Sequence, residues 1–513
     1  MHTKRFYIHT LGCRVNQAQS DEIAVKLSDA GWAQTDTLND ADICIVNTCT
    51  VTGEADKKSR KTVRSLMRRN NADVYVCGCS VAINSEVYSK IGAKVSLNEL
   101  GLSNTSEQIK HNQNLEKGES KASEEWANAE KCESEVSELQ SKAEKEESKA
   151  TEQQSNTEKG KNKAAGQQAK TLKNTKASEQ QAKTTQNNNS QSSTLRLHAR
   201  RGIVIQNGCN NACTYCIVHT ARGPARSKPA CEILAECMAL AKDGVHEIIL
   251  TGIDLGAWKG LTTYYPVTIS SKIGIDLGAW KGSTTPASHS NPQTLSMLLK
   301  LLLANTPDDL RFRLSSIEPT SIDEQLIDML AKSDGRLCRY LHIPLQSGST
   351  KILQEMHRHY TAKEYSNLIE TLQKACPEIA ISTDIIVGFP GETEQDFQET
   401  YELAKQAKFM KLHIFPYSMR EGTPAAQRTD QIDPQTKADR AKRLKKLNDE
   451  LYARDLANRY GSLEGVIIET KTEQITSENA YLCTGTTESF HTIKFISKEK
   501  EGSLVNAVIQ PSI

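Results

Sequence analysis

Apolar and polar residues alternate with two different periods along the first hundred positions. Short apolar runs typical of strands occur at residues 5–12, 41–49 and 73–79, and two patterns with helical spacing lie between them, at 20–31 and 55–69. Strands that alternate with helices predict a parallel sheet, in which every strand ends at the same edge. We therefore expect an N-terminal parallel α/β domain over residues 1–102.

The same alternation resumes, with longer helices, after residue 195. Strand patterns occur at residues 201–208, 246–252, 310–316, 340–346, 379–388 and 411–417, with helical patterns between them. Strands joined by crossover helices predict a partial or open (β/α) barrel, here over residues 195–434. Polar and glycine-rich residues follow these strands, which is where barrel active sites lie.

The C-terminal segments have a different pattern. Residues 435–460 read as a strongly basic helical linker, of the kind that usually presents a solvated face and also suits phosphate contacts. Residues 461–513 alternate like short antiparallel strands, which predicts a small β domain.

Two segments depart from these patterns. Residues 103–194 are dominated by Lys, Glu, Ser, Gln, Ala, Thr and Asn in near-repeats, so they offer too little apolar surface to offset the entropy of ordering. We interpret them as a long disordered insertion. The nonapeptide GIDLGAWKG occurs twice, at Gly252–Gly260 and Gly274–Gly282. The first copy continues a strand, and we assign the functional loop to it; we expect the second copy to form an extra loop.

Bulk composition narrows the class of protein. The chain has 513 residues, 14 cysteines and a net charge of +1, so it is neither a short disulfide scaffold nor a strongly basic protein. Its start lacks a signal-peptide pattern, and no apolar run is long enough to cross a bilayer. We expect a cytoplasmic protein without a membrane partner, in a reducing compartment where thiolates remain available for metal.

Three thiols in the pattern C-x3-C-x2-C are the strongest chemical signal. Cys209, Cys213 and Cys216 can hold three irons of a 4Fe–4S cluster and leave the fourth iron without a protein ligand, open to a substrate or cofactor. A structural zinc site is the alternative, because His219 would complete a Cys3His set.

A second group of thiols lies in the N-terminal domain. Cys13, Cys49 and Cys79 each follow one of the three predicted strands, so the topology brings them to one edge of the sheet. We predict a second three-thiolate iron–sulfur site there. Cys77 is a rival third ligand, and Cys44, in mid-strand, is better explained as a small buried hydrophobe.

The chain resembles the radical-SAM methylthiotransferase family. The resemblance rests on motifs along most of the sequence: TLGCRVNQAQSD, NTCTVTGEADKKSR, the cysteine triplet, SSIEP, HIPLQSGS, DIIVGFPGET and HIFPYSMREGTPA. NTCTVT and LSSIEP look like the branch that acts on threonylcarbamoyladenosine next to the tRNA anticodon. The C-terminal β module is similar to TRAM domains, which bind RNA.

The resemblance implies two 4Fe–4S clusters and two molecules of S-adenosylmethionine (SAM). Cys209, Cys213 and Cys216 would hold the SAM-cleaving cluster, and the other three thiols an auxiliary cluster. One SAM would donate the methyl group and the other the 5′-deoxyadenosyl radical. SAM contacts are implied, by position in the motifs, for Thr251, Gly252, Ser316, Glu318, Gln346, Ile386 and Gly388. No residue is assigned an acid–base role.

The implied partners are tRNA and an external electron donor of the reductase or flavodoxin type, with the chain itself a monomer. His342, His413 and Tyr417 occupy strand positions where a satisfied core or wall residue is the better interpretation. Two alternatives remain. The same chemistry could act on isopentenyladenosine in tRNA or on a ribosomal protein, or the chain could be a non-catalytic, zinc-containing RNA-binding protein.

Overall fold

Four parallel strands form the sheet of the N-terminal domain, in the order β2-β1-β3-β4. The computed structural model describes residues 3–69, 72–102, 199–260, 294–475 and 480–511. The strands are β1 (Arg5–Thr10), β2 (Ala33–Gln34), β3 (Ile43–Thr48) and β4 (Asp73–Gly78), and the helices are α1 (Arg14–Asp29), α2 (Gly53–Arg69) and α3 (Cys79–Ile91). The predicted parallel α/β domain is confirmed.

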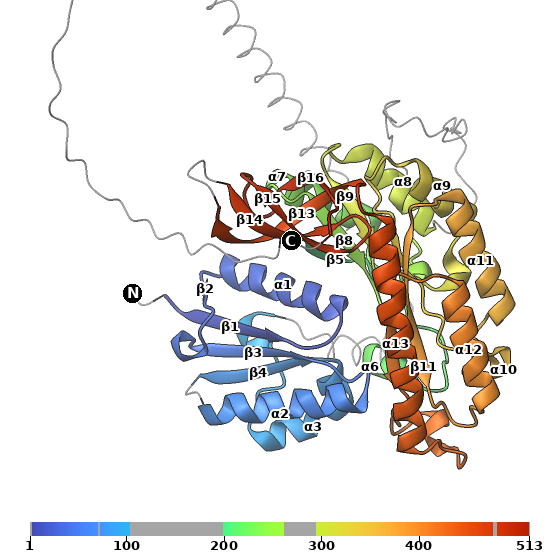
Figure 1. Ribbon diagram of the computed structural model, residues 1–513. Coiled ribbons are helices and arrows are strands. Elements are labelled where there is room, and N and C mark those ends of the chain that lie inside the picture. Colours follow the sequence, from blue (N-terminus) through green and yellow to red (C-terminus); the bar gives the residue numbers. More distant parts are fainter. Residues whose placement is uncertain (1–2, 70–71, 103–198, 261–293, 476–479, 512–513) are drawn as a thin grey trace, which may run out of the picture. The chain divides into compact units, whose positions relative to one another are not determined.

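Helices cover both faces of this sheet (Figure 1). All six residues of β3 are buried, because its successive side chains point to opposite faces and each face is covered. Ile45 belongs to one buried cluster with Leu27 of α1, whereas the neighbouring Val46 belongs to another with Val63 of α2 and Tyr88 of α3. The layered packing fixes the strand ends, and with them the loops that follow.

Six parallel strands form the central domain, as the sequence predicted. They are β5 (Arg201–Val204), β8 (Glu247–Thr251), β9 (Arg311–Leu314), β10 (Tyr340–His342), β11 (Ala380–Val387) and β12 (Lys411–Pro416). They pair as β5-β8-β9 and β10-β11-β12, and single parallel bridges such as Ser316 to His342 connect the two groups. The result is a partial barrel. Between β5 and β8 in the sequence, β6 (Gln206–Asn207) and β7 (Arg226–Ser227) form a short antiparallel pair.

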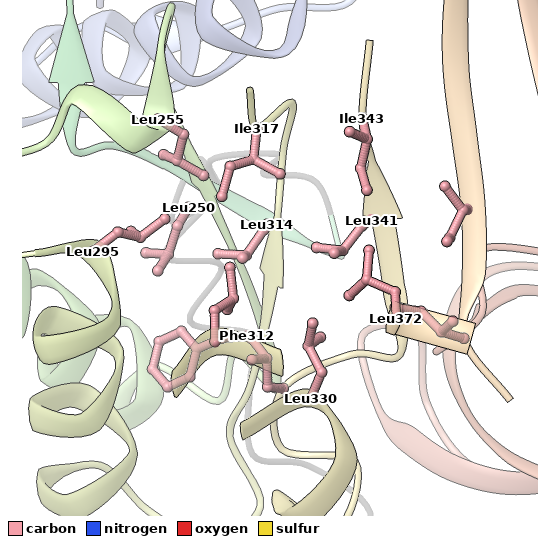
Figure 2. Close-up of a cluster of buried hydrophobic side chains, with 14 of the residues drawn as sticks. Leu250, Leu255, Leu295, Phe312, Leu314, Ile317, Leu330, Leu341, Ile343 and Leu372 are labelled. Atoms are coloured by element: carbon pink, nitrogen blue, oxygen red, sulfur yellow. The ribbon is translucent and has the colours of Figure 1, made fainter. Parts of the chain in front are cut away.

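Helices on the outer side of these strands complete the core. They are α7 (Ala230–Lys242), α8 (Leu295–Asn305), α9 (Glu324–Lys332), α10 (Thr350–Glu355), α11 (Ala362–Ala375) and α12 (Glu394–Gln406), with the short α6 (Val218–Arg222) following the cysteine triplet. Leu250, Leu314 and Leu341 come from three successive strands and meet Leu330 and Leu372 of the helices (Figure 2). Each fully buried side chain of this size contributes about 1.5–3 kcal/mol.

The basic helix predicted at 435–460 is α13 (Pro434–Asn458), capped by Asp433. Its apolar stripe, Leu444, Leu447 and Leu451, is buried in the barrel core, whereas Lys442, Lys445 and Lys446 remain exposed. The helix therefore packs as part of the central domain.

The C-terminal domain is an antiparallel sheet in the order β15-β14-β13-β16, which confirms the predicted small β domain. Its strands are β13 (Leu463–Gln474), β14 (Tyr481–Thr487), β15 (Thr492–Ser497) and β16 (Leu504–Val508).

A buried ion cluster joins this sheet to the start of the barrel strands. Glu247 is fully buried and accepts hydrogen bonds from Arg311 and Arg313 on the adjacent strand, at 2.7 Å each from the Nε atoms. The remaining guanidinium nitrogens donate to main-chain carbonyls of the β domain, at Gly465, Thr486, Thr487 and Glu488. These four contacts are made by side chains of the barrel and backbone of the β domain, and side-chain pairs such as Arg200 with Glu469 and Tyr340 with Phe490 add to them.

The first copy of the repeated nonapeptide is built into the barrel. Leu255 and Trp258 are buried in the main core, and the Trp258 indole Nε1 donates to the Lys228 carbonyl at 3.0 Å. The second copy, Gly274–Gly282, and the insertion at 103–194 lie outside the described residues. Among the described residues, no helix is long and apolar enough to span a bilayer.

Two elements differ from the sequence prediction. Helix α1 begins at Arg14, well before the expected residue 20, because its first turns bury polar residues that break the apolar pattern. Helix α3 was not predicted. Both elements start at a cysteine of the N-terminal group: Cys13 caps α1 and Cys79 opens α3.

Candidate active site

Three thiols converge at the carboxyl edge of the N-terminal sheet. Cys13 caps α1 after β1, Cys49 follows β3 directly, and Cys79 follows β4. The loops of Cys13 and Cys49 touch: Gly12 has a φ of +105°, and a Cβ on it would lie 2.9 Å from Cys49 Sγ, which leaves no room for a side chain. Burial raises the pKa of Cys49 to about 11, with smaller contributions from the neighbouring Cys79 and Cys13 thiols. The structure therefore brings together the three thiols that the sequence grouped.

A guanidinium from the barrel domain lies among these thiols. Arg222, the last residue of α6, is 4% exposed and donates from Nε to Cys79 Sγ at 3.0 Å. Burial alone would lower its pKa, but the thiols of Cys79 and Cys13 raise it, so the group is a fixed cation. This contact joins the two domains at the site.

Asn16 organises the loops around this cation. Its amide oxygen accepts from Arg222 Nη2 at 2.6 Å. Its amide nitrogen donates to the carbonyls of Leu11 and Thr48, at 2.7 and 2.9 Å. Those carbonyls lie in the loops before Cys13 and Cys49, so one buried side chain ties both loops to Arg222.

Two further cysteines lie close by in sequence but differ in environment. Cys77 is buried in a hydrophobic cluster with Ile45 and Leu97, and burial raises its pKa to about 12. Cys44 is fully buried in mid-strand and packs with Val46, as expected for a small hydrophobe. Because Cys77 packs in the apolar layer, the geometry favours Cys79 as the third thiol of the group.

The C-x3-C-x2-C triplet lies in the loop between β6 and α6. Gly208, with a φ of +74°, precedes it, and a Cβ there would lie 1.9 Å from the Pro224 carbonyl oxygen, so only glycine fits. Thr214 anchors the loop, because its hydroxyl donates to the Glu355 carbonyl at 2.8 Å and its amide donates to the Met356 carbonyl. Burial raises the pKa values of Cys209 and Cys216 to about 11.

Charged side chains surround the triplet. Arg358 donates from Nη1 to Cys213 Sγ at 3.3 Å and forms an ion pair with Glu318. Burial raises the pKa of Glu318, and Arg358 opposes that rise. Asp254 accepts from Asn211, inside the triplet, at 3.0 Å. A cation and two carboxylates thus lie beside the three thiols.

Thr251 is the last residue of β8, and Gly252 follows it directly. The Thr251 hydroxyl is buried and has no hydrogen-bond partner among the described residues, and the same holds for Ser315, which follows the adjacent β9. Gly252 approaches Gln206 so closely that a Cβ would lie 3.0 Å from the glutamine side chain. A cavity of about 690 Å³ is lined by both Thr251 and Arg14, the residue after Cys13. The unpaired hydroxyl of Thr251 beside this cavity fits a site for a polar ligand.

The other predicted SAM contacts lie at or after strand ends. Ser316 bridges to His342, and Gln346 adopts a φ of +63° and pairs through its backbone with Ile386. Ile386 packs with Tyr215 of the triplet loop. The structure thus brings Glu318 and Ile386 to the triplet, whereas the side chain of Gln346 makes no hydrogen bond among the described residues.

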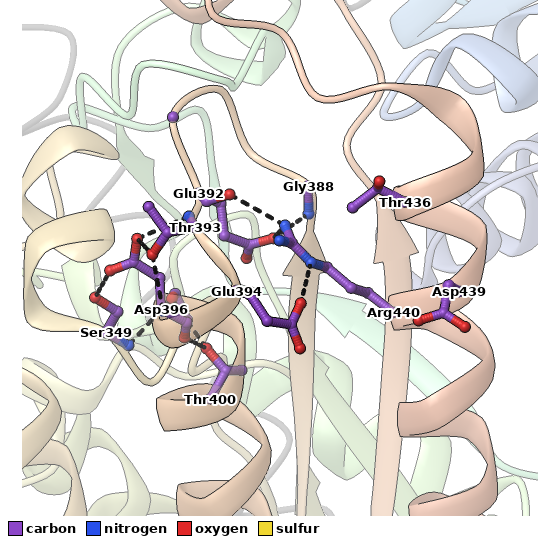
Figure 3. A network of polar contacts seen from close by, with 12 residues as sticks. Ser349, Gly388, Glu392, Thr393, Glu394, Asp396, Thr400, Thr436, Asp439 and Arg440 are labelled. Atoms are coloured by element: carbon purple, nitrogen blue, oxygen red, sulfur yellow. Dashed lines mark hydrogen bonds and ion pairs between the residues drawn. The ribbon is translucent and has the colours of Figure 1, made fainter.

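Gly388 lies in a polar turn before α12 (Figure 3). Its amide donates to Glu392 at 2.6 Å, and a Cβ on it would lie 2.3 Å from Cγ of Lys437 in α13. Thr393 and Asp396 form a capping box at the start of α12. Packing against α13 is sufficient to require glycine at this position.

Two of the three predicted wall residues, His342 and His413, pack against each other within the barrel. His342 contacts Asp384 at 3.1 Å and Ser382 at 2.7 Å, and His413 packs edge-on against it. Tyr417 is buried against Phe389, but its hydroxyl has no hydrogen-bond partner among the described residues, so it is not the satisfied wall residue that the sequence indicated.

His219 is exposed on α6. Within the described part of the chain, no three His, Cys, Asp or Glu side chains are grouped tightly enough to share one metal ion. In a 4Fe–4S cluster, by contrast, each of three thiolates binds a different iron.

Four residues of the site were missed by sequence reasoning: Asn16, Arg222, Asp254 and Arg358. Asp254 alone carried a signal, since it follows a strand end where barrel active sites lie. The others act across large sequence separations and have no local pattern.

Comparison with known families agrees with the two groups of thiols. Residues 203–404, which contain the triplet, match the radical SAM superfamily. Residues 5–98, which contain Cys13, Cys49 and Cys79, match the uncharacterized protein family UPF0004. The fold and the triplet thus define a radical SAM enzyme.

Similarity to characterised relatives extends along nearly the whole chain. Threonylcarbamoyladenosine tRNA methylthiotransferase MtaB of Bacillus subtilis is 31% identical over 494 residues, which cover 96% of this chain and 90% of the relative. The MtaB of Thermotoga maritima is 29% identical over 459 residues, covering 89% and 83%. A tRNA-2-methylthio-N(6)-dimethylallyladenosine synthase of Clostridium botulinum (strain Okra) is 29% identical over 512 residues, covering 98% and 94%. The chain belongs to the radical SAM methylthiotransferase family, in its MtaB-type branch. The chain is therefore an enzyme of this family and not a non-catalytic zinc protein, the alternative that the cysteine triplet alone left open.

Proposed function

We propose that this enzyme adds a methylthio group to the adenine ring of N6-threonylcarbamoyladenosine next to the anticodon of tRNA. The observation that carries the proposal is the presence of two separate three-thiol groups in one chain, one in each family region. The substrate is inferred from the MtaB of Bacillus subtilis, the relative with 31% identity.

The donor sets fit two 4Fe–4S clusters. Cys209, Cys213 and Cys216 would hold the first, and Cys13, Cys49 and Cys79 the second; three thiolates leave one iron of each cluster open. When bound, the clusters and two SAM molecules would supply the electron, the radical and the methylthio group that the transfer needs.

The chain's own residues hold and orient these groups. Arg358 is tied to Glu318 and donates to Cys213, so it fixes one thiol of the triplet and neutralises part of the thiolate charge. The unpaired hydroxyl of Thr251 can hydrogen-bond to a ligand at the end of β8. Ile386, packed against Tyr215, offers an apolar wall next to the triplet. We assign SAM contacts to Thr251, Gly252, Ser316, Glu318, Gln346, Ile386 and Gly388.

A second candidate substrate is isopentenyladenosine in tRNA. The observation that favours it is the nearly equal identity, 29% over 98% of the chain, to a dimethylallyladenosine synthase. A ribosomal protein substrate ranks third, because it rests on the wider family alone.

The remaining parts of the proposal concern partners and place. We propose that the enzyme acts as a monomer in the cytoplasm and receives electrons from an external reductase or flavodoxin-type protein. The β domain of β13 to β16 would contact tRNA, together with the exposed lysines of α13.

Mass spectrometry of nucleosides from total tRNA tests the substrate. Cells that lack the gene are complemented with the wild-type chain, with Cys213→Ala, or with Cys231→Ala, which removes a buried cysteine of α7 outside both thiol groups. We expect the methylthio form of threonylcarbamoyladenosine to be restored by the wild type and by Cys231→Ala only. Restoration of methylthio-isopentenyladenosine instead would establish the second candidate. If neither nucleoside responds, the substrate is not one of these two tRNA bases.

A further inference from the structure

We propose that Arg222 is a positioning residue that raises the reduction potential of the auxiliary cluster and fixes it relative to the SAM-cleaving cluster. The proposal rests on the proposed function, because it takes Cys13, Cys49 and Cys79 as ligands of an iron–sulfur cluster.

The first observation is a direct contact with one ligand sulfur. Nε of Arg222 donates to Cys79 Sγ at 3.0 Å, while Nη1 donates to Asn207 and Nη2 to Asn16. The planar guanidinium is therefore held at all three nitrogens, and its orientation toward the sulfur is fixed.

The second observation is a missing counter-ion. Arg222 is 4% exposed, yet among the described residues it forms no ion pair with a carboxylate. Its hydrogen-bond acceptors are the amide oxygens of Asn16, Gln19 and Asn207 and the sulfur of Cys79. A buried cation without an anion is costly, by several kcal/mol. The negative charge that balances it must come from the thiolates and whatever they hold.

The effect on redox chemistry follows from charge. Adding an electron to a cluster increases its negative charge, and a nearby cation with an N–H···S hydrogen bond stabilises the reduced form more than the oxidised form. Arg222 supplies both features, so it raises the reduction potential. Arg222 hydrogen-bonds to Cys79, whereas Cys13 is exposed. The guanidinium therefore stabilises the negative charge on the three ligand sulfurs to different extents.

The third observation is the placement of α6 between the two thiol groups. At its start, the Val218 amide donates to Cys216 Sγ at 3.4 Å, and at its end, Arg222 donates to Cys79 Sγ. The helix has only five residues. One short rigid element thus makes an N–H···S contact with each group, which fixes their separation.

The test isolates the auxiliary cluster in the full-length chain. Cys209, Cys213 and Cys216 are replaced by Ala together, and the protein is reconstituted anaerobically with iron and sulfide. Iron content and the midpoint potential, from a redox titration followed by electron paramagnetic resonance, are then measured with and without Arg222→Gln. The matched control is Arg226→Gln, which removes an arginine that contacts the Arg222 carbonyl and no sulfur.

We expect Arg222→Gln to retain iron and to shift the midpoint to a more negative potential, while Arg226→Gln leaves it unchanged. Arg222→Lys, which keeps the charge but loses the planar fork, should shift it less. If Arg222→Gln does not hold a cluster, the midpoint potential of Arg222→Lys is compared with that of the triple-Ala parent instead. An unchanged midpoint in a variant that holds its full iron overturns the inference. Absence of iron in the triple-Ala parent itself would instead overturn the auxiliary cluster, and with it both proposals.

Discussion

The amide oxygen of Asn16 accepts a hydrogen bond from Nη2 of Arg222 at 2.6 Å, although the two residues are 206 positions apart and belong to different domains. The other end of the same amide binds the carbonyls of Leu11 and Thr48. One asparagine side chain therefore links both thiol-bearing loops of the N-terminal sheet to the helix that follows the cysteine triplet.

Replacing Asn16 with Ala should destabilise the protein. The change leaves buried carbonyls and one guanidinium nitrogen without partners, and we expect a loss of about 1–3 kcal/mol in the free energy of unfolding. Denaturant unfolding of the apoprotein measures it. Gln19→Ala is the control, because Gln19 accepts only a longer, 3.3 Å bond from Arg222 and should cost less. Equal losses in the two variants would contradict the central role of Asn16.

Iron analysis can separate Cys79 from Cys77 as the third auxiliary ligand. We expect Cys79→Ala to lose the iron of the auxiliary site, because it removes the sulfur next to Arg222. Cys77→Ala should keep that iron and lose only some stability, because Cys77 packs in the apolar layer with Ile45. The reverse result would reassign the ligand.

The triplet can be tested without affecting the N-terminal site. Cys213→Ala should abolish reductive cleavage of SAM, measured as 5′-deoxyadenosine by chromatography, and should leave iron at the auxiliary site. Cys44→Ala is the matched control, since it removes a buried cysteine that packs with Val46. SAM cleavage that persists in Cys213→Ala would exclude the triplet as the cleaving site.

The ion cluster at the start of the barrel should make stability depend on acid. Burial would raise the pKa of Glu247, but Arg313 and Arg311 hold it well below its usual range. Its unfolded pKa is about 4.3, so its contribution is fully present above that pH and is lost as pH falls toward the folded value. Glu247→Gln leaves the arginines without a counter-ion and should cost about 3–5 kcal/mol at pH 7. The variant should also show a flatter fall in melting temperature between pH 5 and pH 3, compared by calorimetry.

The duplicated nonapeptide offers a matched pair of tryptophans. Trp258, in the first copy, is 1% exposed in the barrel core, and Trp258→Ala should cost about 3–5 kcal/mol. The sequence predicts a small effect for Trp280→Ala in the second copy, because the first copy is the one that continues a strand. Thermal melts of the two variants provide the comparison, and a larger loss from Trp280→Ala would show that the copies were assigned in the wrong order.

Hydrophobic periodicity was sufficient to predict the layers of this protein. The strands at Ile43–Thr48 and Ala380–Val387 are buried along nearly their whole length and appear in the sequence as segments rich in β-branched apolar residues. The cysteines could also be grouped in advance, because parallel strands bring their carboxyl ends to one edge. The start of α1 was missed for a physical reason: Asn16 and Ser20 are buried polar residues that serve the thiol loops, and they obscure the apolar face of the helix.

The polar partners of the thiols could not be predicted in this way. Arg222 and Arg358 reach Cys79 and Cys213 over 143 and 145 residues of sequence, and each resembles an ordinary surface arginine in its local context. Their function follows from burial and from the acceptors available, which only the folded arrangement supplies. The opposite case is Gly388, where a motif suggested cofactor binding and packing against Lys437 is sufficient to explain the glycine.

The contacts of Arg311 and Arg313 with the C-terminal sheet have an evolutionary consequence. They are made to carbonyl oxygens of Gly465, Thr486, Thr487 and Glu488, and every amino acid has such an oxygen. Substitutions at these four positions can therefore leave those hydrogen bonds in place, provided that the strands keep their path. This part of the attachment therefore leaves the choice of side chain at those positions open while the barrel arginines continue to hold the strands in the same place.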